Sequence, residues 1–327
     1  MSFFFKNKRV LITGGTGSLG QTLVRRILAT EMPEQVTVLS RDEAKQYAMR
    51  NSTPDGRLQF RVGDVRDLHS VSAALRDQDV VIHAAALKQV PTCEYFPHEA
   101  VMTNVLGAEN VIRAIEQFDL PIEVVVGIST DKACKPVNTM GMTKAIQERL
   151  FIQGNLRRPR TRFVCVRYGN VLASRGSVVP LFQEQIARGG PVTITTREMT
   201  RFLLSLDYAA DTVFAALQHA EPGETFVPRA PSALVVDIAK ALIGSRPIHT
   251  IFTGIRPGEK IHEIMVSEEE APRVRIHGQW LAIAPMLPEL RRGGPRAGLP
   301  GEYSSSETVM GAAQTEALLR EAKLLDG

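Results

Sequence analysis

A glycine-rich turn close to the beginning of the chain constrains the fold more than any other feature. Gly14, Gly17 and Gly20 follow an apolar segment at residues 10–13 and open a stretch with helical periodicity at residues 19–30. Glycine permits a tight turn and lets backbone amide groups approach a pyrophosphate, which the positive end of the following helix attracts. A strand, a glycine-rich turn and a helix in this order are typical of a dinucleotide-binding unit.

The first half of the chain alternates short apolar segments with helical patterns. Further segments that we predict to be strands lie at residues 36–39, 58–62, 80–83, 123–128 and 163–168. Helical patterns begin at Asp42 and extend over residues 97–118 and 140–154. Strands that alternate with helices form right-handed βαβ units. We therefore predict an α/β fold of the Rossmann type, with a doubly wound parallel sheet and helices on both faces.

This alternation ends near residue 170, which indicates a second, smaller unit. We expect loops at residues 174–180, 189–201 and 291–301, a strand at 225–228, a helix at 235–243, an irregular stretch after Glu268, and helical spacing again at 317–324. We therefore predict a cofactor-binding Rossmann domain at residues 1–170, to which the chain returns at about 203–228. Residues 171–202 and 229–327 are predicted to form a smaller C-terminal substrate-binding lobe.

Composition excludes several classes of protein. The 327 residues are 44% hydrophobic and 23% charged, which is ordinary for a globular chain. The net charge of +4 is spread without a basic run, so we expect no nucleic-acid partner, and a small excess of cations suits an anionic small molecule. No apolar run reaches the roughly 18 residues that a membrane span needs.

The cysteines and the N-terminal residues bear on the compartment. The three cysteines, Cys93, Cys134 and Cys165, have neither metal-binding nor disulfide spacing, so we expect no metal site and a protein of the reducing cytoplasm. The aromatic run at residues 3–5 is shorter than the ~7–15 apolar residues of a signal peptide. We expect this segment to pack on the sheet or on a neighbouring subunit.

The ends of the predicted strands bear on which nucleotide binds. An acid after the second strand would hold the ribose hydroxyls of NAD, but the chain has Ser40 and Arg41, which suit a 2′-phosphate and favour NADP over NAD. Asp42 either caps the next helix or orients Arg41. Asp64 either meets the adenine amino group or is a turn residue. His83 lies within an apolar strand, so we expect a core histidine.

Acid–base chemistry is predicted after the fifth strand, where Thr130, Asp131 and Lys132 are adjacent. Ligands bind at the carboxyl ends of the strands in such sheets. Met140 and Lys144 stand one turn apart on the following helix and face the same side. Lys144 either bonds the nicotinamide ribose or is a solvated helix residue. A thioether cannot exchange a proton, so Met140 leaves more of the chemistry to the adjacent acid and amine.

Several longer motifs carry a family resemblance. They are the glycine-rich turn and the segments 40–43 (SRDE), 83–91 (HAAALKQVP), 129–134 (STDKAC), 167–180 (RYGNVLASRGSVVP), 199–202 (MTRF), 254–263 (GIRPGEKIHE) and 302–305 (EYSS). The chain thereby resembles the short, soluble UDP-N-acetylglucosamine 4,6-dehydratases of the extended short-chain dehydrogenase/reductase superfamily, which serve polysaccharide biosynthesis. The resemblance covers residues 8 to about 270 and implies a lyase that makes a 6-deoxy-4-keto sugar.

The resemblance implies a reaction that regenerates its cofactor. Hydride passes from C4 of the sugar to tightly bound NADP⁺ and returns to C6, after the C5 proton and the C6 hydroxyl have left. Lys132 is implied as the C5 base, with a pKa depressed by burial, Lys144 and the nicotinamide, and Asp131 as the acid at the C6 oxygen. Met140 replaces the usual tyrosine, as in a subset of the family, so the C4 proton passes to Asp131, Thr130 or a water relay.

The resemblance and the strand ends together indicate the binding residues. For the cofactor these are Thr13, Gly14, Thr16, Gly17, Ser18, Leu19, Gly20, Ser40, Arg41, Asp42, Lys45, Asp64, Val65, Ala84, Ala85, Ala86, Lys88, Asn104, Lys144, Tyr168, Gly169 and Asn170. For a UDP-sugar they are Lys88, Asp131, Lys132, Asn170, Ser177, Val178, Val179, Leu181, Thr195, Arg201, Arg256 and Glu259. Asn104 either orders the active-site region or is a helix-interior amide that bonds locally.

Two other functions stay open at the level of sequence. A UDP-sugar 4-epimerase shares the first hydride step, but it would want the tyrosine that Met140 replaces and has no use for an acid at C6. A non-catalytic NADP-binding regulator would have no reason to keep Asp131, Lys132 and Lys144 together. The resemblance further implies a homo-oligomer, as a dimer or hexamer, and inversion at C5.

Overall fold

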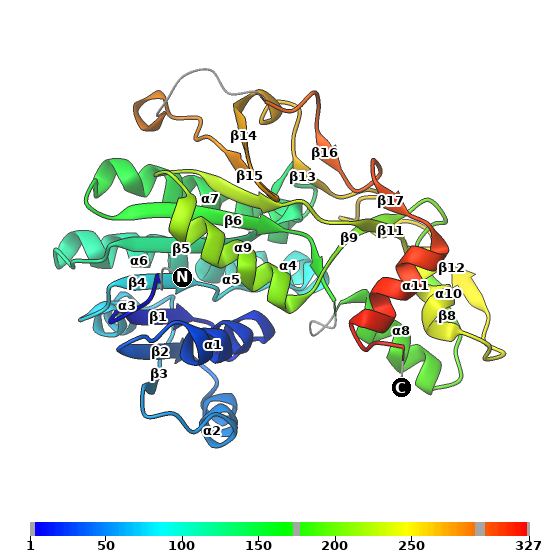
Figure 1. Ribbon diagram of the computed structural model, residues 1–327, viewed down its shortest axis with the longest axis horizontal. Coiled ribbons are helices and arrows are strands. Elements are labelled where there is room, and N and C mark those ends of the chain that lie inside the picture. The colour runs from blue at the N-terminus through cyan, green and yellow to red at the C-terminus, as the bar shows by residue number, and fades with distance from the viewer. Residues whose placement is uncertain (1–3, 173–176, 292–297, 326–327) are drawn as a thin grey trace.

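The computed structural model describes residues 4–172, 177–291 and 298–325, and its centre is a nine-stranded sheet (Figure 1). From one edge to the other the strands are β14 (Val274–His277), β15 (Trp280–Ile283), β10 (Thr225–Pro228), β6 (Arg162–Tyr168), β5 (Val124–Thr130), β4 (Val80–His83), β1 (Arg9–Thr13), β2 (Gln35–Ser40) and β3 (Leu58–Val62). The strands from β10 to β3 pair in parallel, and β15 and β14 continue the sheet antiparallel.

Helices cover both faces of this sheet, as the doubly wound prediction requires (Figure 1). On one face, α1 (Ser18–Thr30) and α9 (Leu206–His219) bury side chains such as Leu23, Ile27 and Val213 against the strands. On the other face, α3 (Leu68–Leu75), α6 (Gly107–Gln117) and α7 (Thr139–Arg157) contribute a second core. The predicted α/β fold of the Rossmann type is confirmed.

A smaller group of elements lies beside the carboxyl ends of the main strands (Figure 1). Its helices are α8 (Val178–Ala187), α10 (Val235–Ile243) and α11 (Ala312–Glu321), which enclose a core of their own. A four-stranded sheet runs in the order β17 (Val309–Met310), β11 (Ser232–Leu234), β9 (Thr200–Leu204) and β7 (Asn170–Val171). Two strand pairs, β12 (Thr250–Phe252) with β8 (Val192–Ile194) and β13 (Ile264–Val266) with β16 (Tyr303–Ser304), complete it.

Several predicted boundaries need correction. The single helix expected at 97–118 is instead α5 (Pro97–Ala100), a π-helix at Val101–Leu106 and then α6. Within the loops expected at 174–180 and 189–201, residues 178–180 begin α8, and β8 and β9 form, because their apolar residues pack into a core whose partners come from distant segments. Of the predicted loops, residues 174–176 and 292–297 lie outside the described residues.

The C-terminal stretch also contains more order than its pattern indicates. The part after Glu268, expected to be irregular, supplies β14 and β15 to the main sheet, since β15 pairs with β10. These strands fall within residues 229–327, and the division of the chain into two domains stays a prediction.

Part of the N-terminal aromatic run and all three cysteines are buried in the fold. Phe5 is buried and meets Phe214 of α9 edge-on, so this part of the N-terminal aromatic run packs on the Rossmann core, while Phe3 lies outside the described residues. Cys93, Cys134 and Cys165 are free and buried. In the described part of the chain, no helix has both the length and the apolar character to cross a membrane.

Candidate active site

Two adjoining cavities open at the carboxyl ends of the parallel strands. The larger, of about 580 Å³, is lined by the glycine-rich turn, residues 84–91, Ile128–Lys132, Met140, Lys144, Tyr168–Val171, Ser177, Leu206 and Arg256. The smaller, of about 440 Å³, is lined by Gly14, Thr16, Leu39–Asp42, Lys45, Gly63–Val65, Ala85, Ala86 and Thr103. Both include Gly14, Ala85 and Ala86, so together they form one elongated binding region.

The glycine-rich turn has the geometry of a phosphate cradle. Gly14 has a positive φ of 66°, and a Cβ there would lie 2.8 Å from the backbone of Ala85. A Cβ on Gly20 would lie 2.5 Å from Gly15, so α1 packs against the turn. Among the described residues, no side chain caps the N-terminus of α1 at Gly17. The free amide groups of this helix end therefore face a site that suits an anion.

The smaller cavity brings together the residues predicted to select the nucleotide. Ser40 Oγ lies 2.9 Å from Thr16 Oγ1, and the Arg41 guanidinium lies 3.6 Å from Asp64. Asp42 caps α2 (Glu43–Ser52) by accepting a hydrogen bond from the Lys45 amide, so the capping interpretation is confirmed. Asp64 accepts hydrogen bonds from the amide and guanidinium of Arg66, and it also lines the cavity.

Lys144 and Met140 lie where the spacing placed them, on the side of α7 that faces the larger cavity. Lys144 is buried and donates hydrogen bonds to the Ile128 carbonyl and to Gln147, so the solvated interpretation is wrong. Burial lowers the pKa of Lys144 to about 8. Met140 is 5% exposed and packs with Cys93 and Ala100. This position therefore presents no proton donor or acceptor to the cavity.

His83 and Asn104 are buried next to the site and line neither cavity. His83 is fully buried, lies 3.1 Å from Thr13 Oγ1, and has a pKa lowered to about 3 by burial, as expected for a core histidine. The Asn104 side chain, in the π-helix, bonds both the amide and the carbonyl of Leu87 and reaches Thr143. Asn104 thus orders the cavity-lining segment around Leu87, and its amide does not bond locally.

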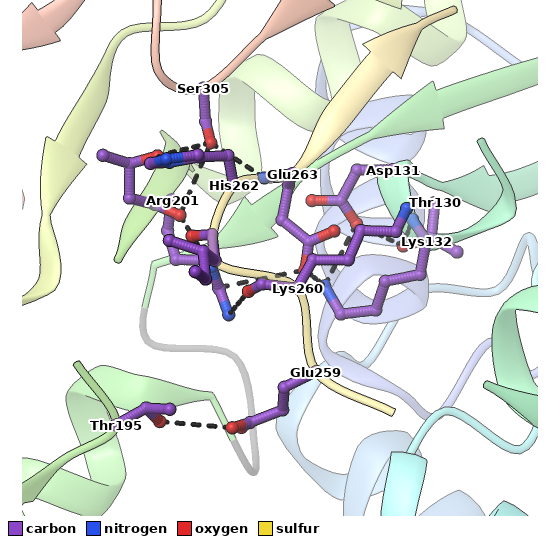
Figure 2. A network of polar contacts seen from close by, with 12 residues as sticks. Thr130, Asp131, Lys132, Thr195, Arg201, Glu259, Lys260, His262, Glu263 and Ser305 are labelled. Carbon is purple, nitrogen blue, oxygen red and sulfur yellow. Dashed lines mark hydrogen bonds and ion pairs between the residues drawn. The ribbon is translucent and has the colours of Figure 1, made fainter. Parts of the chain in front are cut away.

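Asp131 and Lys132 both line the larger cavity, and Figure 2 shows the polar contacts between them and their neighbours. Asp131 is fully buried, and its Oδ1 accepts hydrogen bonds from Thr130 Oγ1 at 2.8 Å and from Lys132 Nζ at 3.1 Å. Burial disfavours the Asp131 carboxylate more than Lys132 stabilises it, so the pKa of Asp131 lies above its usual value. Thr130 bonds Asp131 and so fixes the orientation of this carboxyl.

A third residue, Glu263, joins this pair from a distant part of the chain (Figure 2). Its Oε1 lies 2.9 Å from Lys132 Nζ, and the side chain is almost fully buried. Burial disfavours the ammonium ion, but Asp131 and Glu263 outweigh it, so the pKa of Lys132 lies above its ordinary value. The expectation of a depressed pKa for Lys132 is therefore corrected. Glu263 ends the GIRPGEKIHE motif, but sequence reasoning gave it no role.

Some predicted binding residues lie away from both cavities. Val179 is part of the core beneath α8, and Thr195 Oγ1 donates to Glu259 Oε2 at 3.2 Å. The Arg201 guanidinium is buried and donates to the carbonyls of Thr200, Lys260 and Ile261, so it fixes the backbone ahead of Glu263. The predicted residues that do not line either cavity are Thr13, Asn104, Val178, Val179, Leu181, Thr195, Arg201 and Glu259.

A Rossmann sheet, a glycine-rich turn and a buried helix lysine beside a strand-end acid define a short-chain dehydrogenase/reductase of the extended type. The family described as polysaccharide biosynthesis protein matches residues 10–285. The chain belongs to this family.

Relatives and solved structures agree with this membership. The chain is 42% identical to the UDP-N-acetylglucosamine 4,6-dehydratase (inverting) of Campylobacter jejuni subsp. jejuni serotype O:23/36 (strain 81-176), over 86% of this chain and 84% of that protein. It is 46% identical to the UDP-glucose 4-epimerase of Rickettsia prowazekii (strain Madrid E), over 85% and 83%. The X-ray structure of Pen from Bacillus thuringiensis superposes with a TM-score of 0.92 at 33% identity, covering 98% of this chain and all of that one. The resemblance drawn from the motifs is confirmed.

Proposed function

We propose that the chain is an NADP-dependent sugar-nucleotide 4,6-dehydratase, a hydro-lyase that converts UDP-N-acetylglucosamine to UDP-2-acetamido-2,6-dideoxy-4-hexulose. One observation carries the proposal: the buried acid Asp131 and the half-buried amine Lys132 line the same cavity as Lys144, while Met140 offers no phenol there. Loss of water across C5 and C6 requires one group that takes a proton and another that gives one, within a small patch. The adjacent pair supplies both.

The residues of the elongated binding region fit a nicotinamide dinucleotide. The close approach at Gly14 leaves no room for a Cβ, and the uncapped α1 terminus suits a pyrophosphate. Ser40 and Arg41 would hold a 2′-phosphate, which favours NADP over NAD. When bound, the nicotinamide supplies the acceptor and donor of hydride. Lys144, buried below the larger cavity, would orient the ribose next to it.

The larger cavity also offers contacts for a UDP-sugar. Arg256 and Lys88 provide positive charge at its wall for a diphosphate, and Asn170 and Ser177 provide hydrogen-bonding groups. The C4 hydroxyl must lose its proton during the first hydride transfer. Since residue 140 is a methionine, this proton passes to Asp131, to Thr130 or to water. We place the reaction in the cytoplasm, in a homo-oligomer, with inversion at C5.

A second function has support from one observation. The Rickettsia relative at 46% identity is named an epimerase, and a UDP-sugar 4-epimerase would use the same cofactor and the same first step. An epimerase, however, needs no acid beside C6, whereas here Lys132 and Asp131 lie in the cavity wall. The dehydratase therefore accounts for more of the site than the epimerase does.

The product formed from UDP-N-acetylglucosamine tests this proposal. We expect the purified protein, loaded with NADP⁺, to give a C6 methyl doublet in the proton NMR spectrum without net change in the cofactor. An N-acetylgalactosamine product would identify an epimerase, and an unchanged spectrum would contradict the dehydratase. The same sample without added nucleotide is the control for tightly bound cofactor.

A further inference from the structure

Arg256 reaches the larger cavity from a segment that contains neither helix nor strand. Residues 253–263, all within the described part of the chain, join β12 to β13, and Arg256 and Pro257 are exposed there. The Arg256 side chain nevertheless lines the cavity. An exposed segment without regular structure keeps a side chain in one place only if other parts of the fold hold its backbone.

Residues 256–259 form a tight turn that sets the direction of Arg256. The Glu259 amide donates to the Arg256 carbonyl at 3.1 Å, and Gly258 has a φ of +78°. Proline at the second position and a glycine with positive φ at the third are typical of a type II turn. The Glu259 carboxylate accepts hydrogen bonds from the Arg256 amide at 3.3 Å and from Thr195 Oγ1 at 3.2 Å (Figure 2). The place of Arg256 therefore depends on the place of the whole turn.

Asn138 binds this turn at the start of α7. Its Nδ2 donates to the Gly258 carbonyl at 2.7 Å. Asn138 is 5% exposed, so water competes little for this hydrogen bond. A Cβ on Gly258 would lie 3.0 Å from the Asn138 Cβ, and the absence of a side chain at Gly258 therefore permits the close contact.

The other end of the Asn138 side chain belongs to α7. Its Oδ1 accepts a hydrogen bond from the Gly141 amide at 2.8 Å and so caps the helix. The partners determine this orientation of the side chain, since Nδ2 donates to a carbonyl and Oδ1 accepts from an amide. α7 carries Met140 and Lys144, which line the same cavity as Arg256. One asparagine therefore joins two parts of the cavity wall.

Further hydrogen bonds hold the segment that follows the turn. Lys260 Nζ donates to the Cys134 carbonyl at 2.6 Å. The Arg201 guanidinium donates to the carbonyls of Lys260 and Ile261 at 3.0 Å and 3.1 Å. These bonds fix the chain after the turn, whereas Asn138 binds within the turn itself. Asn138 lines neither of the two cavities, so it affects a ligand only through the parts of the chain that it holds.

We propose that Asn138 is a positioning residue for a nucleoside diphosphate: it holds the turn at residues 256–259 on α7 and thereby keeps Arg256 at the cavity wall, where the guanidinium binds phosphate. The kind of ligand rests on the proposed function, to which this inference adds the residue that places the cation. A guanidinium binds phosphate through two parallel hydrogen bonds, which need a fixed geometry. Loss of the bond from Asn138 should therefore weaken binding of the diphosphate and leave the dinucleotide site unchanged.

The binding of UDP to Asn138→Ser tests the proposal. Serine can still cap α7, but its shorter side chain loses the bond to the Gly258 carbonyl. Isothermal titration should show UDP binding weakened by about ten-fold and NADP⁺ binding within about two-fold of the wild type, because only the contact of Arg256 with phosphate is disturbed. Asn51→Ser, the same change at an exposed residue that lines neither cavity, should bind UDP as the wild type does. Equal UDP affinity in Asn138→Ser and the wild type would refute the proposal.

A change on the other side of the contact should have the same effect. Gly258→Ala brings a methyl group to 3.0 Å from the Asn138 Cβ, which pushes the turn away from α7 and should weaken UDP binding as Asn138→Ser does. Gly278→Ala is the matched control for backbone strain, since Gly278 also has a positive φ, of 58°, but a Cβ there meets nothing within 4 Å. If the two alanine variants weakened UDP binding alike, the contact with Asn138 would not be the cause, and the proposal would fail.

A double-mutant cycle separates positioning from a general loss of structure. Arg256→Ala should itself weaken UDP binding, and Asn138→Ser added to it should weaken binding by less than about two-fold more, because both changes remove the same contact. Losses that multiply would show that Asn138 does not act through Arg256, and would overturn the proposal. The cycle does not depend on turnover. If the wild type shows this coupling but gives no C6 methyl product, only the dehydratase function is refuted.

Discussion

Arg41 and Asp64 face each other in the smaller cavity, and their separation of 3.6 Å bears on the choice of nucleotide. The Arg41 side chain is half exposed, so it can turn from Asp64 to a phosphate at little cost. Ser40, held by Thr16, provides a hydroxyl beside it. The site therefore offers a cation and a hydroxyl that would suit the 2′-phosphate of the proposed NADP.

Replacement of Arg41 by alanine should distinguish the two cofactors. We expect Arg41→Ala to weaken NADP⁺ binding by about ten-fold or more, because a charge-assisted contact to the phosphate is lost, and to leave NAD⁺ binding within about two-fold. Isothermal titration with each nucleotide measures this. Arg76→Ala, an exposed arginine that lines neither cavity, is the control. Equal weakening of both nucleotides would show that Arg41 does not select between them.

Residues of the site differ in how far the sequence could predict them. Asp131, Lys132, Met140 and Lys144 were predictable because each lies next to a strand end or at a helical spacing from another. Glu263 was not, since periodicity reports only local structure, and its contact with Lys132 depends on how β13 pairs with β16. Arg201 was predicted to bind the UDP-sugar, but its guanidinium donates to backbone carbonyl groups instead. These contacts are tertiary too, so the local pattern did not reveal them.

At the level of elements, the start of α7 crosses closely over the turn that carries the proposed catalytic pair, Asp131 and Lys132. A Cβ on Gly141 would lie 2.2 Å from the Lys132 carbonyl oxygen. Asn138 caps this helix by accepting a hydrogen bond from the Gly141 amide, and it also donates to the Gly258 carbonyl. The position of Lys132 therefore depends on a glycine in the first turn of a neighbouring helix.

Gly141→Ala should disturb catalysis more than cofactor binding. The added methyl group cannot fit unless the Lys132 backbone moves, and a misplaced catalytic group reduces turnover by about ten-fold or more. Steady-state kinetics and NADP⁺ titration would measure the two effects. Gly56→Ala is the control, since a Cβ there meets nothing within 4 Å. Wild-type kcat in Gly141→Ala would contradict this view of the α7 contact.

Elements with strong local signals were predicted well. β4, β10 and α10 have the predicted bounds, since each is a short apolar run or an amphipathic stretch. The π-helix at Val101–Leu106 was missed, because its widened turns accompany the tertiary bonds of Asn104 to Leu87. β14 and β15 were missed because β15 pairs with the distant β10 and β14 pairs with β15, and the pairing with β10 depends on the tertiary fold.

At the scale of the whole molecule, one buried arginine joins three parts of the chain. Arg167, on β6, is 2% exposed and donates hydrogen bonds to Glu148 of α7, to Glu270, and to the Met265 carbonyl of β13. Its guanidinium lies 2.7 Å from both carboxylates. Burial disfavours the charge of Arg167, but the two carboxylates outweigh it and raise its pKa well above the ordinary value.

Loss of this arginine should destabilise the molecule as a unit. Arg167→Met would leave the buried Glu148 and the largely buried Glu270 without their cationic partner, which costs about 3–5 kcal/mol. Urea unfolding measures this free energy. Arg188→Met, which removes an exposed pair with Glu184 on the surface, should change it by less than about 1 kcal/mol. If both variants lost the same small amount of unfolding free energy, the buried cluster would not hold these segments together.

The three cysteine thiols are buried in the folded chain, so each becomes reactive only when the region around it unfolds. Burial raises the pKa of Cys93 and raises that of Cys134 to about 12, and Cys165 lies within the central sheet. None of the three cysteines presents a thiolate to a reagent while the chain is folded. Each of them reports on a different region: the segment before the π-helix, the turn beside Lys132, and the strand β6. The order in which alkylating reagents reach them would therefore record the order in which these regions come apart.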